Sequence, residues 1–150
     1  MAYQYGYDYE EKKYTPPTLQ TDRSMWKLML LSTVTLSIYG IIFFIPFSFD
    51  LDKVAPKPDR SKTMNFLVAY IASLFTFSIV MAFWHYHIAQ RIEEALIERD
   101  IRYEFGTNDF WWWYCFGSLM LGVGTFVYFH KLCKAMNLLC ADYNEKNAAA

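Results

Sequence analysis

Charge is scarce in this chain: Asp, Glu, Lys and Arg together make up 19% of its 150 residues, and the formal net charge is −1. A balance this close to zero leaves no basic surface that would attract nucleic acid. Cysteine is sparse as well, with three residues and no Cys-x-x-Cys pair, which excludes a disulfide-stabilised mini-protein. Hydrophobic residues make up 55% and aromatic residues 20%, which excludes a disordered chain.

The few charges avoid three long segments altogether. Residues 28–49, 64–84 and 110–129 contain no Asp, Glu, Lys or Arg. A helix needs about 20 apolar residues to cross a hydrocarbon core about 30 Å thick, and each segment has that length. A soluble chain of this size cannot bury three helices that are apolar on every face. We therefore expect an all-α integral membrane protein with three transmembrane helices.

The remaining residues divide into tails and connections. Residues 1–24 form a polar N-terminal tail that contains Tyr and Pro, residues 25–143 form the membrane domain, and residues 144–150 form a C-terminal tail. The connection 50–63 is polar and contains two prolines, which predicts a loop.

The other two polar stretches have helical spacing. After Trp84, apolar residues recur every three or four positions, which predicts an amphipathic helical extension that ends at Gly106. The run 130–143 has an apolar side and a side with two lysines, which predicts a C-terminal amphipathic helix at the membrane surface. Three consecutive tryptophans, residues 111–113, point in different directions on a helix and suggest an interfacial aromatic belt.

Small hydroxyl residues recur inside the apolar segments. Residues 32–38 and 73–79 both fit the pattern Ser-x-x-Thr-x-Ser-Ile. Such residues let helix backbones approach and let hydroxyl groups bond across helices, although each hydroxyl can also bond only a carbonyl of its own helix. We favour association, with a homo-oligomer or a membrane-protein partner bound through these faces. The small residues that share a face in each segment are Thr33, Ser37 and Gly40, then Ala69, Ser73 and Thr76, then Ser118 and Gly122.

The same residues resemble a known family of bacterial membrane proteins, domain-of-unknown-function (DUF) family 4234. The resemblance rests on a repeated motif of the type Thr-x-Gly-Ile-Tyr-Gly, followed by aromatic residues. It is seen in residues 35–40 (TLSIYG), less completely in 76–79 (TFSI), and as a weaker echo in 117–124. Ser37 and Ser78 stand where glycine is usual. The resemblance extends from about Met25 to Asn144; it implies a bacterial membrane protein and no particular activity.

No pattern marks a catalytic centre. The chain has no Gly-rich phosphate loop, no Gly-x-Ser-x-Gly and no zinc-protease motif. We interpret His85, His87 and His130 as interfacial residues, and expect the first two to lie at the membrane face opposite His130. The acidic residues of 93–100 are interpreted as a solvated helix face. Cys115, Cys133 and Cys140 are interpreted as small apolar fillers. We therefore expect no catalytic residue, no cofactor and no bound metal.

These observations predict a small non-enzymatic integral membrane protein of the bacterial cytoplasmic membrane. It would lie in the lipid bilayer and act by helix association, as an accessory or scaffold subunit or as a homo-oligomer. The alternative is an oligomeric transporter or channel for a small solute, and a third possibility is a lipid-acting enzyme that uses His85, His87 or Glu94. Across three spans the 14 Lys and Arg residues divide evenly between the two sides, so the sequence leaves the orientation open.

Overall fold

The computed structural model describes residues 17–56, 62–76, 78–119 and 122–149. All regular structure in these ranges is helical, which confirms the expected all-α class. The elements are α1 (Met25–Val34), α2 (Ile38–Val54), α3 (Phe66–Phe75), α4 (Ile79–Glu98), α5 (Thr107–Asp109), the π-helical η1 (Phe110–Phe116), α6 (Gly117–Leu119) and α7 (Val123–Ala148).

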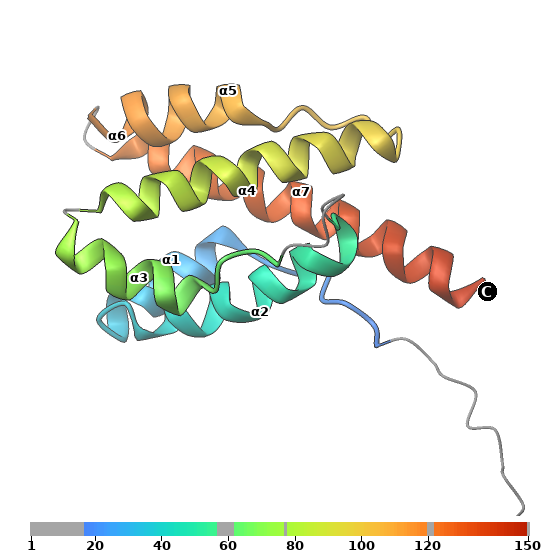
Figure 1. Cartoon of the computed structure of the whole chain (residues 1–150), viewed down its shortest axis with the longest axis horizontal. Coiled ribbons are helices and arrows are strands. Elements are labelled where there is room, and N and C mark those ends of the chain that lie inside the picture. The colour runs from blue at the N-terminus through green and yellow to red at the C-terminus, as the bar shows by residue number, and fades with distance from the viewer. Residues whose placement is uncertain (1–16, 57–61, 77, 120–121, 150) are drawn as a thin grey trace, which may run out of the picture.

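The helices form three hairpins whose turns lie at the same end of the molecule (Figure 1). The first hairpin pairs α1 with α2, the second pairs α3 with α4, and the third pairs α5, η1 and α6 with α7. Each apolar segment is thus interrupted near its middle, so the three transmembrane helices expected from segment length are not confirmed. None of the described helices combines the length and the apolar composition that crossing a membrane requires.

The first two hairpin turns are built from the repeated Thr-x-Ser motif. Ser37 and Ser78 adopt the left-handed conformation, with φ of 73° and 66°, and Gly122 takes the same position in the third hairpin with φ of 76°. The hydroxyl of Thr35 accepts a hydrogen bond from the backbone N–H of Tyr39 at 2.9 Å and so satisfies an amide at the start of α2. Thr76 contacts the N–H of Val80 in the equivalent way at 3.4 Å. The repeat therefore encodes a turn.

Large apolar and aromatic side chains from α2, α4 and α7 form the core. Phe47, Leu51, Ile88, Tyr128 and Met136 are fully buried there. The α5–α6 side packs onto α7 through η1. Since these residues lie on helices far apart in the chain, the core holds the three hairpins together as one body.

A short segment before α1 is fixed along α7 by two asparagines. The side chain of Asn144 bonds both the N–H and the C=O of Leu19, at 2.7 Å each. The side chain of Asn137 does the same for Arg23, at 3.0 and 2.8 Å. This part of the polar N-terminal tail is therefore held by two pairs of hydrogen bonds between asparagine side chains and its backbone. Residues 1–16 lie outside the described residues.

Three helix ends differ from the sequence-based expectation. α2 continues through Pro46 to Val54, so residues 50–54 of the expected loop are helical. α4 does extend past Trp84, but it ends at Glu98 rather than at Gly106, because Asp100 turns the backbone with φ of 53°. The second half of the third apolar segment and the expected C-terminal amphipathic helix form one continuous helix, α7.

Candidate functional site: apolar hairpin tips on a charged base

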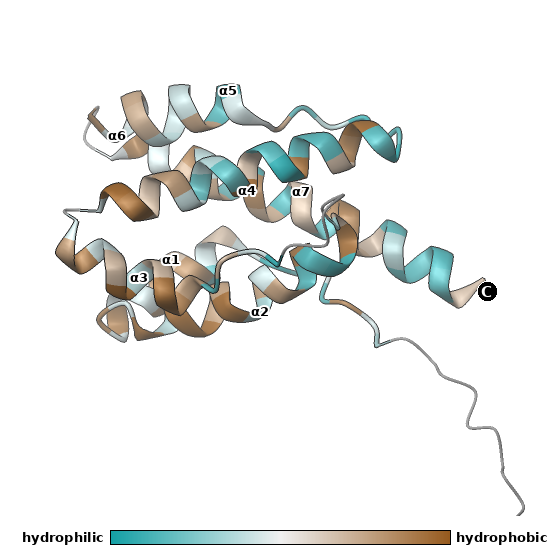
Figure 2. Ribbon diagram, viewed as in Figure 1, coloured by the Kyte–Doolittle hydropathy of each residue, from teal (hydrophilic) through white to brown (hydrophobic). Residues whose placement is uncertain are grey.

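The three turns present large apolar side chains to the outside, and we call this end of the molecule the tips. Leu36 is 88% exposed, Phe75 82% and Leu119 83%. Apolar colour gathers toward this end and polar colour toward the opposite end (Figure 2). The tips also include the exposed side chains of Val34, Ile38, Leu74, Ile79 and Val123. Exposed apolar surface of this kind marks a membrane or protein contact.

The left-handed residue of each turn has its backbone N–H bonded within the chain, despite the exposure of the tips. The N–H of Ser37 donates to the carbonyl of Ser32 at 2.7 Å, and that of Ser78 donates to the carbonyl of Ser73 at 2.9 Å. In the third hairpin the N–H of Gly122 donates to the carbonyl of Ser118 at 3.1 Å. Backbone groups that are satisfied within the chain are what an apolar environment requires.

Several hydroxyl groups in the apolar segments follow the within-helix alternative. Each of them donates to a backbone carbonyl three or four residues earlier, and none of these bonds crosses to another helix. The residues concerned are Thr33, Thr35, Ser73, Thr76 and Ser118. Ala69 and Ser73 are moreover buried inside the molecule, so these two residues pack within one chain.

At the opposite end, which we call the base, charged side chains are drawn inward. Arg23 is buried and pairs with Asp50 at 2.5 Å. Arg91 pairs with Asp52 at 3.0 Å, and Arg99 pairs with Asp142. These pairs join helices that are distant in the sequence. Loss of one partner of such a buried pair strongly destabilises the fold, because it leaves an uncompensated charge inside the protein.

Two of these arginines also close the carboxyl end of α2. Arg91 donates to the carbonyl of Ala55, and Arg99 donates to the carbonyl of Val54 at 2.6 Å. The last carbonyls of a helix carry partial negative charge, so a guanidinium there is favourable. Burial acts to raise the pKa of Asp52, but hydrogen bonds from Thr63 and Arg91 outweigh it and hold the pKa below its usual value. Asp52 is therefore charged at neutral pH.

The three histidines occupy different environments. His85 is buried among aromatic rings, with ring centroids of Tyr114 at 4.9 Å and Phe129 at 5.5 Å. Burial lowers the pKa of His85 to about 3, and its Nδ1 has no hydrogen-bond partner among the described residues. His87 is exposed. Because His85 lies beside Phe129, the residue before His130, the expectation that His85 and His130 lie at opposite faces is wrong.

The remaining candidate groups have structural partners. Glu93 accepts hydrogen bonds from the N–H and the hydroxyl of Thr107, at 3.0 and 3.1 Å, and so fixes the start of α5. Cys133 and Cys140 are buried, and burial raises the pKa of Cys133 to about 12, as suits an apolar filler. No three His, Cys, Asp or Glu side chains within the described ranges come together as a metal site.

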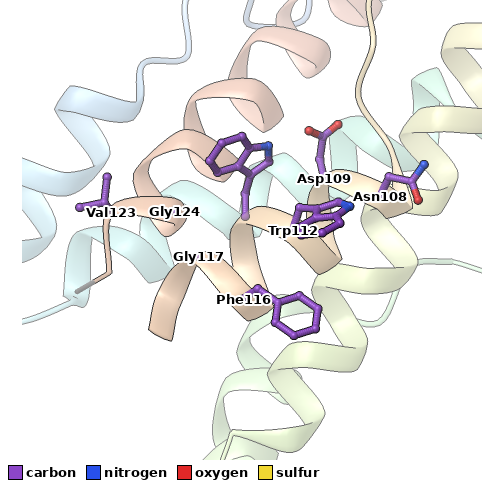
Figure 3. A pocket seen from close by; sticks show the side chains of 8 residues that line it. Asn108, Asp109, Trp112, Phe116, Gly117, Val123 and Gly124 are labelled. Carbon is purple, nitrogen blue, oxygen red and sulfur yellow. The ribbon is translucent and has the colours of Figure 1, made fainter. Parts of the chain in front are cut away.

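A hollow of about 660 Å³ opens between η1 and α7, near the tips (Figure 3). Trp112, Trp113 and Phe116 line it, and Asp109 lies at its edge. The sequence did not predict this hollow, since it depends on the packing of two helix segments. Trp111 lines a separate hollow of about 330 Å³, in keeping with its different direction on the helix.

Two glycines bring the walls of the third hairpin together. A Cβ on Gly124 would lie 2.3 Å from the Cα of Gly117, and one on Gly117 would lie 2.6 Å from the Cα of Gly124. Only glycine permits this approach of two backbones. The Gly-x-Gly in the third apolar segment therefore serves a turn at Gly122 and a close contact at Gly124.

Comparison with known proteins gives one match. The family described as Domain of unknown function (DUF4234) matches residues 23–94, which comprise the first hairpin, the connection after it and most of the second hairpin. No curated protein and no solved structure matches the chain. Both Thr-x-Ser turns lie inside the matched residues, whereas η1 and α7 lie outside them. The resemblance to the DUF4234 family is therefore confirmed for residues 23–94.

Proposed function

We propose that this protein is a non-enzymatic integral membrane protein of the bacterial cytoplasmic membrane, and that its three hairpins enter one leaflet with the tips first. The observation that carries the proposal is the shared direction of the three turns, with exposed apolar residues at the tips and paired charges at the base. The base then lies at the membrane surface.

The length of the hairpins supports this arrangement. α1 and α3 each have ten residues, which is about 15 Å at 1.5 Å per residue. That is half of a hydrocarbon core about 30 Å thick. Three straight spans would require every hairpin to open at its hydrogen-bonded turn. A hairpin that enters and leaves one leaflet needs no such change.

The arrangement also accounts for the even division of positive charge. The positive-inside rule compares loops on opposite sides of a membrane. If all three apolar segments turn back, the tails and both connections lie on the same side. The tie among the 14 Lys and Arg residues then carries no information about orientation.

Within the membrane, we propose that the protein acts by association, as an accessory or scaffold subunit or as a homo-oligomer. α1 supports this proposal, because Trp26, Leu30 and Val34 form an exposed stripe with a spacing of four residues. A transporter or channel is less well supported, since the hydroxyl groups of Thr33, Ser73 and Thr76, which are the polar side chains available to line a path, already donate within their own helices. A crosslinking ladder that shows only monomer, with no co-purifying partner, would contradict action by association.

Cysteine labelling of intact cells tests the hairpin arrangement. Single probes replace Lys53, Arg102 and Asn147 in a chain whose own cysteines are changed to alanine. If the hairpins turn back, all three probes react from the same side. If the segments cross the membrane, Arg102 reacts from the side opposite Lys53 and Asn147, and that result would overturn the proposal.

A pair of variants tests insertion of the tips. Phe75→Asp places a charge in a tip side chain that is 82% exposed, and Ile97→Asp is the matched control at the base, where Ile97 is 74% exposed. A charge at depth in the bilayer is costly, so F75D loses retention in carbonate-washed membranes. I97D is retained like the unmodified protein. Equal retention of the two variants would contradict insertion at the tips.

A further inference from the structure

A smaller hollow lies where the apolar part of the second hairpin meets the base. Its volume is about 290 Å³. Val80 and Phe83 line its apolar part, and His87 and Arg91 line its polar part. Phe83, His87 and Arg91 follow one another at intervals of four on α4, so a single helix stripe changes from apolar to charged along the hollow.

Arg91, which lines this hollow, has one side-chain donor without a partner among the described residues. The residue is 7% exposed, and its two terminal nitrogens are occupied by Asp52, Thr63 and the carbonyl of Ala55. Its Nε is buried and has no acceptor in the part of the chain that the structure describes. A buried N–H of a charged group is unfavourable when it is left unpaired. An acceptor supplied from outside the chain would complete the site.

We infer that this hollow binds a phospholipid, with a phosphate oxygen accepting from Arg91 Nε and an acyl chain lying along Val80 and Phe83. Guanidinium groups recognise phosphate well. His87 is positioned one helical turn from Arg91 to contact the same headgroup. The acyl chain would run toward the tips, parallel to the lipids of the leaflet. This inference rests on the proposed insertion of the hairpins.

The charge of the site predicts its selectivity. Asp52 already pairs with Arg91, so the site offers a directed donor with little net positive charge. We therefore expect phosphatidylcholine and phosphatidylglycerol to bind with similar affinity. The diacylglycerol with the same chains has no phosphate and should bind at least tenfold more weakly.

The test uses the full chain, purified in a nonionic detergent. Four probes are added separately: dioleoyl phosphatidylglycerol, dioleoyl phosphatidylcholine, dioleoylglycerol and inorganic phosphate. The melting temperature and the phospholipid retained after detergent washing are both measured. Either phospholipid should raise the melting temperature by a few degrees, because it binds the folded state alone. Dioleoylglycerol should not.

Variants locate the effect. Val80→Trp fills the apolar part of the hollow, and Val68→Trp is its control on the exposed surface of α3, where Val68 is 56% exposed. V80W should lose the shift and the retained lipid, whereas V68W should keep both. Arg91→Lys retains the charge but lacks the Nε donor, and it should also lose the shift. Since Arg91 also supports α2, V80W and His87→Ala decide the matter if R91K does not fold.

Each outcome bears on the inference. Equal shifts in V80W and V68W, or equal shifts from dioleoylglycerol and phospholipid, would overturn it. An equal shift from inorganic phosphate would support the Arg91 site and identify free phosphate as a sufficient source. Flotation of the unmodified protein with vesicles separates the two proposals. A protein that floats but shows no specific shift contradicts only the lipid site, and one that shows the shift but does not float contradicts insertion.

Discussion

The two ends of the hairpins follow opposite rules. At the tips, side chains as large as Leu36 and Phe75 are more than 80% exposed, and the left-handed residue of each turn has its N–H bonded within the chain. At the base, Arg23 and Arg91 are each less than 10% exposed and are paired with aspartates. A bundle in water buries apolar groups and exposes charge at both ends. The contrast teaches that the two ends are suited to different surroundings, and variants at each end sharpen it.

The largest expected effect is at the base. Arg23→Met removes the buried partner of Asp50 and leaves that largely buried carboxylate with only the more distant and more exposed Lys53, at 3.6 Å, so we expect a loss of about 3 kcal/mol of unfolding free energy. Guanidinium unfolding in detergent measures it. The exposed pair Lys146–Asp142 is the control, and Lys146→Met should cost less than about 1 kcal/mol. Similar losses in the two variants would mean that the base is not held by its buried pairs.

The next largest loss of unfolding free energy is expected near the tips, where Gly117 and Gly124 are in close contact. Gly124→Ala places a Cβ 2.3 Å from the Cα of Gly117, so the third hairpin must separate, at a cost of about 3 kcal/mol. The control is Gly40→Ala, where the new Cβ would meet only the Ser32 hydroxyl at 3.4 Å. The same unfolding measurement applies, and a G124A protein as stable as G40A would contradict the packing of η1 on α7.

Between the two ends, His85 predicts a dependence on pH. Its pKa is about 3 in the folded protein because of burial, against an ordinary value of 6.5, so the unfolded chain takes up the proton first. The stabilising contribution is complete above pH 6.5 and decreases as the pH falls from 6.5 toward 3. We expect a loss of about 2 kcal/mol between pH 7 and pH 5. His85→Leu should flatten this part of the pH profile; an unchanged slope would show that His85 is accessible to protons.

The smallest effect concerns the turn itself. Ser78 has φ of 66°, a conformation that costs a non-glycine residue about 1 kcal/mol, so Ser78→Gly should raise stability by about that amount. Ser73→Gly, a buried position inside α3, should lower stability by a comparable amount. Thermal unfolding of the two variants side by side compares them. If S78G is destabilised as much as S73G, residue 78 does not adopt the left-handed conformation.

The sequence predicted the all-α class, but it indicated only in part that a turn interrupts each apolar segment. The all-α class and the DUF4234 resemblance came from apolar length and from the Thr-x-Ser motif, and both are confirmed. The motif also held the missing signal, since Ser37 and Ser78 stand where glycine is usual, and glycine is favoured where φ is positive. Because the motif was interpreted only as a surface for helix packing, the turns at Ser37 and Ser78 were not predicted.

The sites could not be predicted because their parts come together only through folding. Arg23 meets Asp50, and Arg99 meets Asp142, across long separations in the chain. The hollow beside Arg91 likewise combines α4 with the connection before α3. Periodicity and charge runs report neighbours on one helix and carry no information about such pairs.

By itself, the sequence determined where charge is absent and where the chain can turn, because both are properties of short stretches of residues. The tertiary structure decided that the three turns share one end and that arginines close the carboxyl end of α2. It also decided that Arg91 has a buried donor with no acceptor among the described residues. These features depend on the packing of α2, α4 and α7 around a common core. Packing is a relation between distant residues, so it is settled only when the whole chain has folded.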